Sequence, residues 1–411
     1  MTSPKTNAVN VSLRVDNALI FDGHSAELQD GSILIQNGVI AQVGEVDAPA
    51  DRAIDAKGGV AIPGLIDAHF HAYGASLDLL ELQSSPLSYI ALSAAVRLRD
   101  TLQRGFTTVR DVAGGDAGLA KALSQGLLPG PRYLFTGAAL SQTGGHGDPH
   151  PSDSELCAHG GDHLAEIVDG VDALRKVVRE RFRSGAHAIK IMASGGVVSP
   201  TDPLRNPQYS AEEIAAVTDE ARRRGSYVAA HAYSSEAVVH AVTNGVRTIE
   251  HGNLIDRPTA EVMREHDAFL VPTLAAYEAM DRRGAELGMA EVSRRKNREV
   301  LEWGQRAIEI ARDAGVQIGF GTDLMGALED EQLVGLRLQA EADGILNTLR
   351  SATSVNAAII GRDDVGVIRA GAQGDLVLLA GNPFEDASVL WDRRRPRTVV
   401  HAGTTVGDPQ T

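Results

Sequence analysis

His69 and His71 are the first residues of this 411-residue chain whose types and spacing suit metal binding. They close an apolar run that predicts a β-strand over residues 65–71. Because side chains alternate along a strand, both imidazoles lie on one face and suit a single divalent ion. A lone His-x-His pair is weakly diagnostic, and its alternative is two surface or core histidines.

Three further residues with metal-binding side chains stand at or near the ends of predicted strands: His231, His251 and Asp323. In barrels of parallel strands the active site lies at the carboxyl ends of the strands. Side chains from four strands would therefore converge on one point. Imidazole and carboxylate together suit zinc or a similar divalent ion.

Lys190 lies inside the apolar run 188–192, although a strand that is buried on both faces should be wholly apolar. Burial lowers the pKa of a lysine amine and leaves it neutral and nucleophilic. Such an amine can add carbon dioxide and become a carbamate, an anionic ligand able to bridge two metal ions. The alternative is a lysine paired with a buried carboxylate such as Asp111.

Short apolar strands alternate with longer amphipathic segments, including predicted helices at 211–224 and 291–314, which favours βαβ units. Both chain ends read as short strands, with an Asn-Gly hairpin signal at 37–38. We therefore expect an α/β fold: a (β/α)₈ TIM barrel over residues 62–355 and a small β-sandwich domain made of 1–61 and 356–411. Eight strands, as a closed barrel needs, are predicted at 65–71, 107–112, 132–137, 188–193, 227–233, 248–252, 269–274 and 316–323.

Composition and charge exclude several functional classes. The formal net charge of -15 argues against a nucleic-acid partner. Cys157 is the single cysteine, which removes intrachain disulfides and thiolate zinc clusters. No signal peptide or membrane-length apolar run is found, so we expect a cytoplasmic protein without a membrane partner. We also expect a homo-oligomer that acts on a small molecule.

Several motifs resemble a known family. The run PGLIDAHFH at 63–71, together with the strand lysine, the strand-end histidines and the final aspartate, resembles the amidohydrolase superfamily, in the subtype with a carboxylated lysine bridge. The motifs GGHGD at 144–148, MASGGV at 192–197, HAYS at 231–234 and EHGN at 250–253 are similar to the imidazolonepropionase-related, prolidase-like branch. Characterised members of that branch include dipeptidases that release C-terminal Pro, Arg or Lys, and amidases that act on N-acyl amino acids.

The resemblance implies two divalent ions, expected to be zinc with Mn²⁺ or Fe²⁺ as alternatives. Each ion would have its own ligand set, with carboxylated Lys190 as the bridge: His69, His71 and Asp323 for the first ion, and His231 and His251 for the second. His146 and Tyr233 match positions that relatives use to hold the substrate carbonyl or carboxylate. The chain departs from many relatives after Asp148, where PHPS replaces an aromatic-Arg pair, so a basic contact from that loop is in doubt.

The expected reaction is hydrolysis of the amide bond of a dipeptide or N-acyl amino acid with a free C-terminal carboxylate. Metal coordination would lower the pKa of a bridging water, and Asp323 would pass its proton to the departing amine. His146 or Tyr233 would assist in polarising the carbonyl. The alternatives are a lactonase or cyclic-amide hydrolase, a one-metal deaminase, against which Lys190 argues, and a non-catalytic scaffold, whose usual sign is missing ligands.

Other polar residues receive structural interpretations. The remaining histidines of the His-rich loop at 146–163, which are His150, His159 and His163, have no strand geometry and are interpreted as solvated. Cys157 lacks the paired base of a nucleophile. No Gly-Lys-Ser/Thr follows Gly195 and Gly196, so this pair predicts a tight turn lining the active site and not a phosphate loop.

Overall fold

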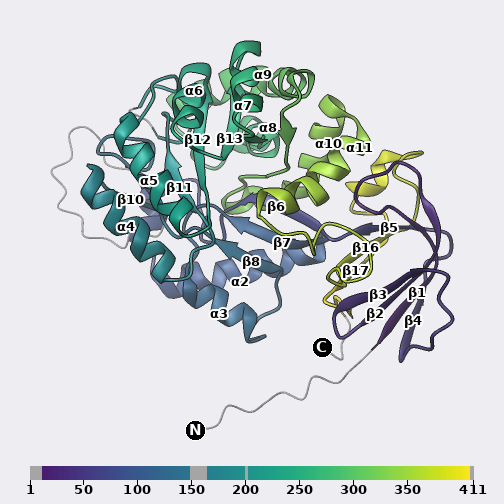
Figure 1. Ribbon diagram of the computed structural model, residues 1–411. Helices are drawn as coiled ribbons and strands as arrows, with labels where there is room; N and C mark the ends of the chain where they lie inside the picture. The colour runs from purple at the N-terminus through teal and green to yellow at the C-terminus, as the bar shows by residue number, and fades with distance from the viewer. Residues whose placement is uncertain (1–11, 149–163, 200–201, 408–411) are drawn as a thin grey trace, which may run out of the picture.

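The computed structural model describes residues 12–148, 164–199 and 202–407. Of the His-rich loop it describes only residues 146–148, so the interpretations of His150, His159, His163 and Cys157 lie outside the described residues. Two sheets of parallel strands occupy the centre of the molecule (Figure 1). One has the strand order β6-β7-β8 and the other the order β10-β9-β11-β12-β13-β14-β15.

Each of the eight predicted barrel strands has a counterpart in these two sheets. Their bounds are β6 Leu65–Phe70, β7 Phe106–Asp111, β8 Arg132–Phe135, β11 Ile189–Met192, β12 Val228–Ser234, β13 Thr248–Leu254, β14 Phe269–Val271 and β15 Gln317–Ile318. Two short strands were not predicted, β9 Ala139–Ser141 and β10 Ala165–Ile167. Strands β9 and β10 form a parallel pair, and β9 also pairs in parallel with β11.

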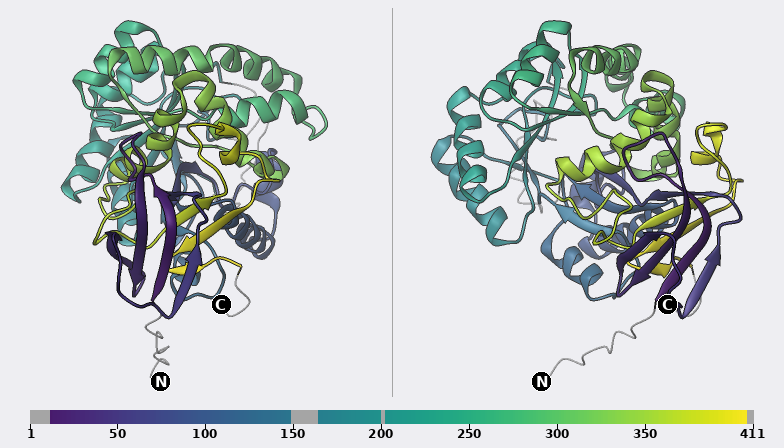
Figure 2. Two further views of the ribbon diagram at one scale, coloured as in Figure 1. Left: turned by 90° about the vertical axis from the view of Figure 1, so that its right-hand side faces the viewer. Right: turned by 45° about the vertical axis from the view of Figure 1, so that its right-hand side comes forward.

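Backbone hydrogen bonds join the two sheets on both sides. Ala68 N in β6 donates to Phe320 O just beyond β15 at 2.9 Å, and His187 N before β11 donates to Phe135 O in β8 at 2.7 Å. Helices lie on the outer side of the strands (Figure 2). The sheets therefore bring the carboxyl ends of β6, β12, β13 and β15 to the same side of the molecule.

Two predicted strands are shorter than the sequence indicated. The run 269–274 leaves the ladder after Val271 because Pro272 has no N–H to donate. The run 316–323 is a strand only as far as Ile318, and beyond it the side chain of Asn356 accepts from the N–H of Phe320 at 3.0 Å and donates to its carbonyl at 2.8 Å. The chain then stays beside β6, where Asp323 N donates to His69 O at 2.9 Å.

Strands from both chain ends form one further mixed sheet, in the order β18-β17-β16-β5-β1-β2-β3, with β4 paired to β1 (Figure 1). The predicted hairpin turn is confirmed, because Asn37 and Gly38 have positive φ values of 53° and 78° between β2 and β3. The bounds are β1 Leu13–Ile20, β2 Gln29–Gln36, β3 Val39–Gly44, β4 Arg52–Asp55, β5 Val60–Pro63, β16 Leu376–Leu379, β17 Arg397–His401 and β18 Thr404–Thr405.

The helices cover the parallel sheets with apolar faces. Both predicted helices are confirmed as α5 and α9, and α5 begins with a capping box between Ser210 and Glu213. In the described part of the chain, no helix combines the length and the apolar character needed to cross a bilayer. The bounds are α1 Leu79–Ser84, α2 Leu87–Gln103, α3 Ala117–Ser124, α4 Val171–Arg183, α5 Ala211–Arg223, α6 Ser235–Thr243, α7 Arg257–Glu265, α8 Leu274–Arg283, α9 Glu291–Ala314, α10 Gln332–Asp343, α11 Ile345–Arg350 and α12 Asn356–Ile359.

Candidate metal centre and active site

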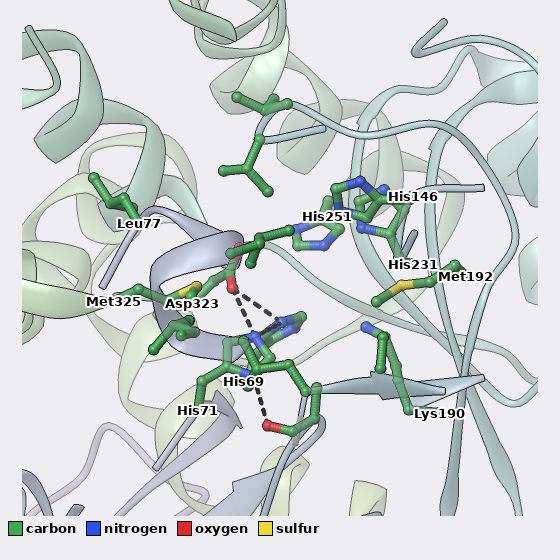
Figure 3. A pocket seen from close by; sticks show the side chains of 18 of the residues that line it. His69, His71, Leu77, His146, Lys190, Met192, His231, His251, Asp323 and Met325 are labelled. Atoms are coloured by element: carbon green, nitrogen blue, oxygen red, sulfur yellow. Dashed lines mark hydrogen bonds and ion pairs between the residues drawn. The ribbon is translucent and has the colours of Figure 1, made fainter. Parts of the chain in front are cut away.

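All the site residues predicted from the sequence line one cavity at the carboxyl ends of the parallel strands (Figure 3). They are His69, His71, His146, Lys190, His231, Tyr233, His251 and Asp323. Except for Asp323, whose side chain is 19% exposed, they are buried. The predicted convergence of several strand ends on one point is therefore what the fold produces.

His69, His71 and Asp323 form the tightest group in the cavity. Their ligand atoms lie within 4.8 Å of one another. The Nε2 atoms of the two rings are 3.2 Å apart, and Asp323 Oδ1 is 3.3 Å from that of His69 and 2.9 Å from that of His71. Two nitrogen lone pairs at this distance repel each other unless a proton or cation lies between them, so the donor set fits a divalent ion.

A buried ion pair between Arg110 and Glu250, which the sequence analysis did not predict, holds His69 in this group. Glu250 Oε2 accepts a hydrogen bond from His69 Nδ1 at 2.8 Å, and Arg110 Nη2 donates to Glu250 Oε1 at 2.7 Å. Neither side chain of the ion pair is exposed. Burial alone would raise the pKa of Glu250, but Arg110 and His69 hold it well below the usual value. The carboxylate is therefore ionised and fixes the ring of His69 with Nε2 directed to the ligand group.

His231 and His251, the predicted second ligand set, are held by neutral groups. His231 Nε2 lies 3.0 Å from Gly195 O, and His251 Nδ1 lies 2.7 Å from the hydroxyl of Tyr277 and 2.8 Å from that of Thr273. The two rings are 4.6 Å apart between centroids. Burial lowers the pKa of both imidazoles well below the usual value, so both are neutral.

The four histidines that are predicted to bind metal share one arrangement, in which one ring nitrogen contacts a protein oxygen. The holding groups include Ala113 O, which lies 3.2 Å from His71 Nδ1. The other ring nitrogens are Nε2 of His69, His71 and His251 and Nδ1 of His231. Nε2 of His251 and Nδ1 of His231 have no hydrogen bond within the described residues. A histidine that binds metal through one nitrogen donates the proton of the other to a protein oxygen, and this arrangement has that form.

Lys190 lies in the same cavity with no hydrogen bond or ion pair to any described residue. Burial lowers its pKa to about 8, although Glu250 and Asp323 act in the opposite direction. The alternative partner, Asp111, is engaged elsewhere, since it accepts from Tyr133 Oη at 2.7 Å and from Ala72 N at 2.9 Å. An unpaired buried lysine among candidate metal ligands is consistent with carbamate formation and not with a structural ion pair.

Two of the candidate ligands stand at positions of unusual backbone conformation. His251 has φ 76° and Asp323 has φ 54°, both in the left-handed region that non-glycine residues seldom adopt. Such conformations gather at functional sites, where the surrounding structure holds them. The turn at His251 brings two consecutive side chains, Glu250 and His251, to the centre, which strict strand alternation would not allow.

His146 packs against the second ligand set. Its ring stacks on that of His231 with centroids 4.2 Å apart, and its Nδ1 lies 2.7 Å from Ser199 Oγ. A Cβ at Gly196 would lie 1.9 Å from His146 Cε1, so only glycine allows this approach. The predicted role of the Gly195-Gly196 turn in lining the site is consistent with that contact, and Nε2 of His146 has no hydrogen bond within the described residues.

Tyr233 and Tyr277 complete the cavity wall beside His251. Their hydroxyl oxygens are 2.9 Å apart, and the Tyr233 ring stacks on His251 with centroids 5.1 Å apart. Tyr277 in α8 was not predicted, because a tyrosine near the start of a helix carries no sequence signal of a contact with a ligand. Arg110 did carry a signal, since it is a charged residue inside a predicted strand, as Lys190 is.

A cavity of histidines, a lysine and an aspartate at the carboxyl ends of parallel strands is typical of metal-dependent hydrolases. Residues 60–406 match the amidohydrolase family, and the chain belongs to that family. Ochratoxinase of Aspergillus niger is 32% identical over 407 residues, which cover 93% of this chain and 83% of ochratoxinase.

Solved structures give the same result. A prolidase complexed with N-methylphosphonate-L-proline is 43% identical, with a TM-score of 0.93 over 96% of this chain and 99% of that one. A Xaa-Pro dipeptidase with methionine bound in its active site is 29% identical, with a TM-score of 0.85 over 96% of this chain and 99% of the other. The protein is therefore a prolidase-like hydrolase that acts on amide bonds.

Proposed function

We propose that the protein is a two-metal hydrolase that cleaves the amide bond of a dipeptide or N-acyl amino acid with a free C-terminal carboxylate. The observation that carries the proposal is a set of four histidines, each with one ring nitrogen held by a protein oxygen. The other nitrogens of His69 and His71 meet at Asp323, and those of His231 and His251 have no hydrogen bond within the described residues. Similarity to a prolidase and to ochratoxinase supports the same reaction.

The ligands would divide between two divalent ions. We expect both ions to be zinc, with Mn²⁺ or Fe²⁺ as alternatives. The first ion would be held by His69, His71 and Asp323 and the second by His231 and His251, with carboxylated Lys190 between them. When bound, such ions polarise an amide carbonyl and bring the pKa of water down to about 7.

The protein's own side chains would move the proton and hold the substrate. Burial alone would raise the pKa of Asp323, but His69 and His71 hold it well below the usual value, so its carboxylate is ionised and can accept a proton from water. It would then deliver that proton to the departing amine nitrogen. Burial raises the pKa of Tyr233, which therefore stays a neutral hydrogen-bond donor. Together with His146, Tyr233 would hold the substrate carbonyl or carboxylate.

The requirement for a free carboxylate gives the test. N-acyl amino acids, Xaa-Pro and Xaa-Arg substrates should be compared with their C-terminal amides on zinc- and manganese-loaded enzyme. Amidation should reduce kcat/KM by about 30-fold, roughly 2 kcal/mol, because a buried anion-binding group is left unpaired. Equal turnover of acids and amides would favour the alternatives, a cyclic-amide hydrolase or a lactonase.

We also propose that the parallel strands close into a (β/α)₈ barrel over residues 62–355, with a separate β-sandwich domain from 1–61 and 356–411. The interstrand hydrogen bonds at both sheet edges and the sheet shared by the two chain ends support this division. We also propose that the protein is a cytoplasmic homo-oligomer, and light scattering of the purified protein tests the assembly.

A further inference from the structure

Lys296 in α9 binds a segment of the cavity wall from outside the cavity. Its side chain is 13% exposed, and its Nζ donates to the carbonyls of Gly196 at 3.0 Å, Ser199 at 2.7 Å and Asp202 at 2.6 Å. An ammonium group has three donors, so these bonds engage all of them. The three carbonyls belong to the chain between β11 and α5, here named the β11–α5 segment and described over residues 193–199 and 202–210. One side chain of α9 thus fixes this segment at three points.

The same segment holds His146, which lines the cavity (Figure 3). His146 Nδ1 lies 2.7 Å from Ser199 Oγ, and His146 N donates to Gln208 Oε1 at 3.0 Å. The ring also packs on Gly196, so closely that a Cβ there would lie 1.9 Å from its Cε1. Residues of the β11–α5 segment therefore fix both the ring and the backbone of His146, and Lys296 binds two of them directly.

Asp202 links these contacts to one another. Its Oδ2 accepts from Gly196 N at 3.0 Å and from Gln208 Nε2 at 3.2 Å. Its Oδ1 has no hydrogen bond within the described residues and lies 3.7 Å from Lys296 Nζ. The side chain of Asp202 is only 4% exposed, and a buried carboxylate without a paired cation is strongly destabilising. Lys296 therefore neutralises the carboxylate that joins two of the residues in contact with His146.

We propose that Lys296 is a positioning residue for His146. Lys296 lies outside the cavity lining, but its three hydrogen bonds set the conformation of the segment that fixes the ring. Without them, Ser199 loses the bond that holds its backbone, and Asp202 loses its countercharge. The inference rests on the proposed function, in which His146 holds the substrate carbonyl or carboxylate, and it names the helix that keeps His146 in place.

Lys296→Met tests this role, because it keeps a long side chain and removes the ammonium. For an Xaa-Pro or N-acyl-proline substrate, kcat/KM of the metal-loaded variant should be about 30- to 100-fold lower than that of the wild type, since a small misplacement of a substrate-holding group has an effect of that order. The metal content should stay close to that of the wild type, because Lys296 bonds the β11–α5 segment and none of the proposed metal ligands.

A double-mutant cycle identifies the residue through which Lys296 acts. In the His146→Gln background, Lys296→Met should lower kcat/KM by less than about threefold, because the group that it positions is already gone. Ser199→Ala removes only the hydroxyl beside the ring and should lower kcat/KM by about fivefold. Lys296→Met/Asp202→Asn removes both charges and gives the same test if the unpaired carboxylate prevents folding of the single variant.

Glu299→Gln is the matched control. Glu299 lies about one turn further along α9 and binds the same segment, because Arg205 Nη2 donates to its Oε1 at 2.8 Å. This ion pair is exposed, with side chains 61% and 42% accessible. Its removal takes away a contact between α9 and the β11–α5 segment without touching Ser199 or Asp202. We expect kcat/KM to stay within about twofold of the wild type.

The ring of His146 can also be followed without a substrate. In zinc-loaded protein with isotope-labelled histidine, the ring NMR signals of His146 are assigned by their loss in His146→Gln. They should shift in Lys296→Met and stay in place in Glu299→Gln. This measurement reports on the position of the ring alone, whatever the reaction is.

The outcomes separate the two proposals. Normal activity in Lys296→Met, equal losses in both backgrounds of the cycle, unmoved ring signals or loss of metal would each overturn the positioning role. Absence of amide turnover by the wild type, or normal turnover by His146→Gln, would contradict the proposed function instead. In that case the ring signals would still decide whether Lys296 holds His146.

Discussion

The two proposed ligand sets of the site differ in how the protein supports them. His69, His71 and Asp323 lie within contact of one another above a buried ion pair, Arg110–Glu250. His231 and His251 are held by a backbone carbonyl and by hydroxyl groups, and their ring nitrogens do not join a common cluster. His69 in the first set is thus supported by a charged group, whereas both histidines of the second set are supported by neutral groups.

This difference indicates what each ion would depend on. A carboxylate behind a histidine makes the ring a stronger ligand than a neutral acceptor does, so the ion at His69 and His71 should bind more tightly. In the proposed arrangement the second ion would have only two protein ligands besides the bridge. It should therefore depend most on Lys190, and substitutions behind each set should affect one ion more than the other.

Lys190→Ala is expected to have the largest effect. Loss of the bridge should remove the second ion and lower kcat/KM by at least about 1,000-fold, equivalent to roughly 4 kcal/mol. Formate or acetate should restore part of the activity by taking the vacated position. Activity is measured with and without the acid in the presence of excess zinc, and activity in Lys190→Ala close to that of the wild type would exclude a bridging role.

Removing the Arg110–Glu250 ion pair should weaken metal binding at the proposed first site, formed by His69, His71 and Asp323. The double variant Arg110→Met/Glu250→Gln removes both charges together, so that no unpaired charge is left buried. We expect metal affinity at the first site to fall by about 10- to 100-fold in chelator competition.

The matched control for this variant is Arg132→Met/Asp375→Asn. It removes a 2.6 Å ion pair between Arg132 in β8 and Asp375, which directly precedes β16 in the sheet formed by both chain ends. It should lower stability without changing metal affinity. Equal loss of affinity in both double variants would show that the Arg110–Glu250 pair acts through stability alone.

The pKa of Lys190, lowered by burial to about 8, predicts a pH dependence for assembly of the site. Only the neutral amine adds carbon dioxide, so at fixed dissolved CO₂ the rate of zinc uptake by metal-free enzyme should rise about tenfold per pH unit below 8 and level off above it. Lys190→Ala reconstituted with acetate has no amine to titrate. Its uptake should lack this step, and the same rise in that variant would place the titration elsewhere.

Tyr277→Phe is expected to have the smallest effect, confined to the second ion. The hydroxyl at 2.7 Å from His251 Nδ1 is lost, but Thr273 remains at 2.8 Å. Affinity for the second ion should fall by about fivefold, within the energy of one neutral hydrogen bond. Tyr209→Phe, whose hydroxyl donates to Val168 O away from the cavity, is the control. A larger loss at the first ion would contradict the division into two sets.

Much of the site is predictable from the sequence because its residues break local rules. His69 and His71 follow from strand alternation, and Lys190 stands out as a charge inside an apolar strand. Arg110 broke the same rule, but its partner could not be named from the sequence. The parallel strands and the shared terminal sheet followed from periodicity and from the Asn-Gly turn.

The remaining features depend on tertiary contacts that have no local signal. Glu250 precedes His251, and alternation would place the two on opposite faces; only the left-handed turn at His251 brings both inward. Beyond the end of β15, the side chain of Asn356 bonds the backbone of Phe320 from 36 residues away. Tyr277 reaches His251 because α8 starts directly beyond β14.

The metal content of the purified protein tests the two-ion account most directly. Elemental analysis of wild-type protein grown with zinc or manganese should give close to two ions per chain. Lys190→Arg should hold at most one and be inactive, because a guanidinium stays protonated and cannot add carbon dioxide. One ion or none in the wild type, or two ions with near-normal activity in Lys190→Arg, would contradict the account.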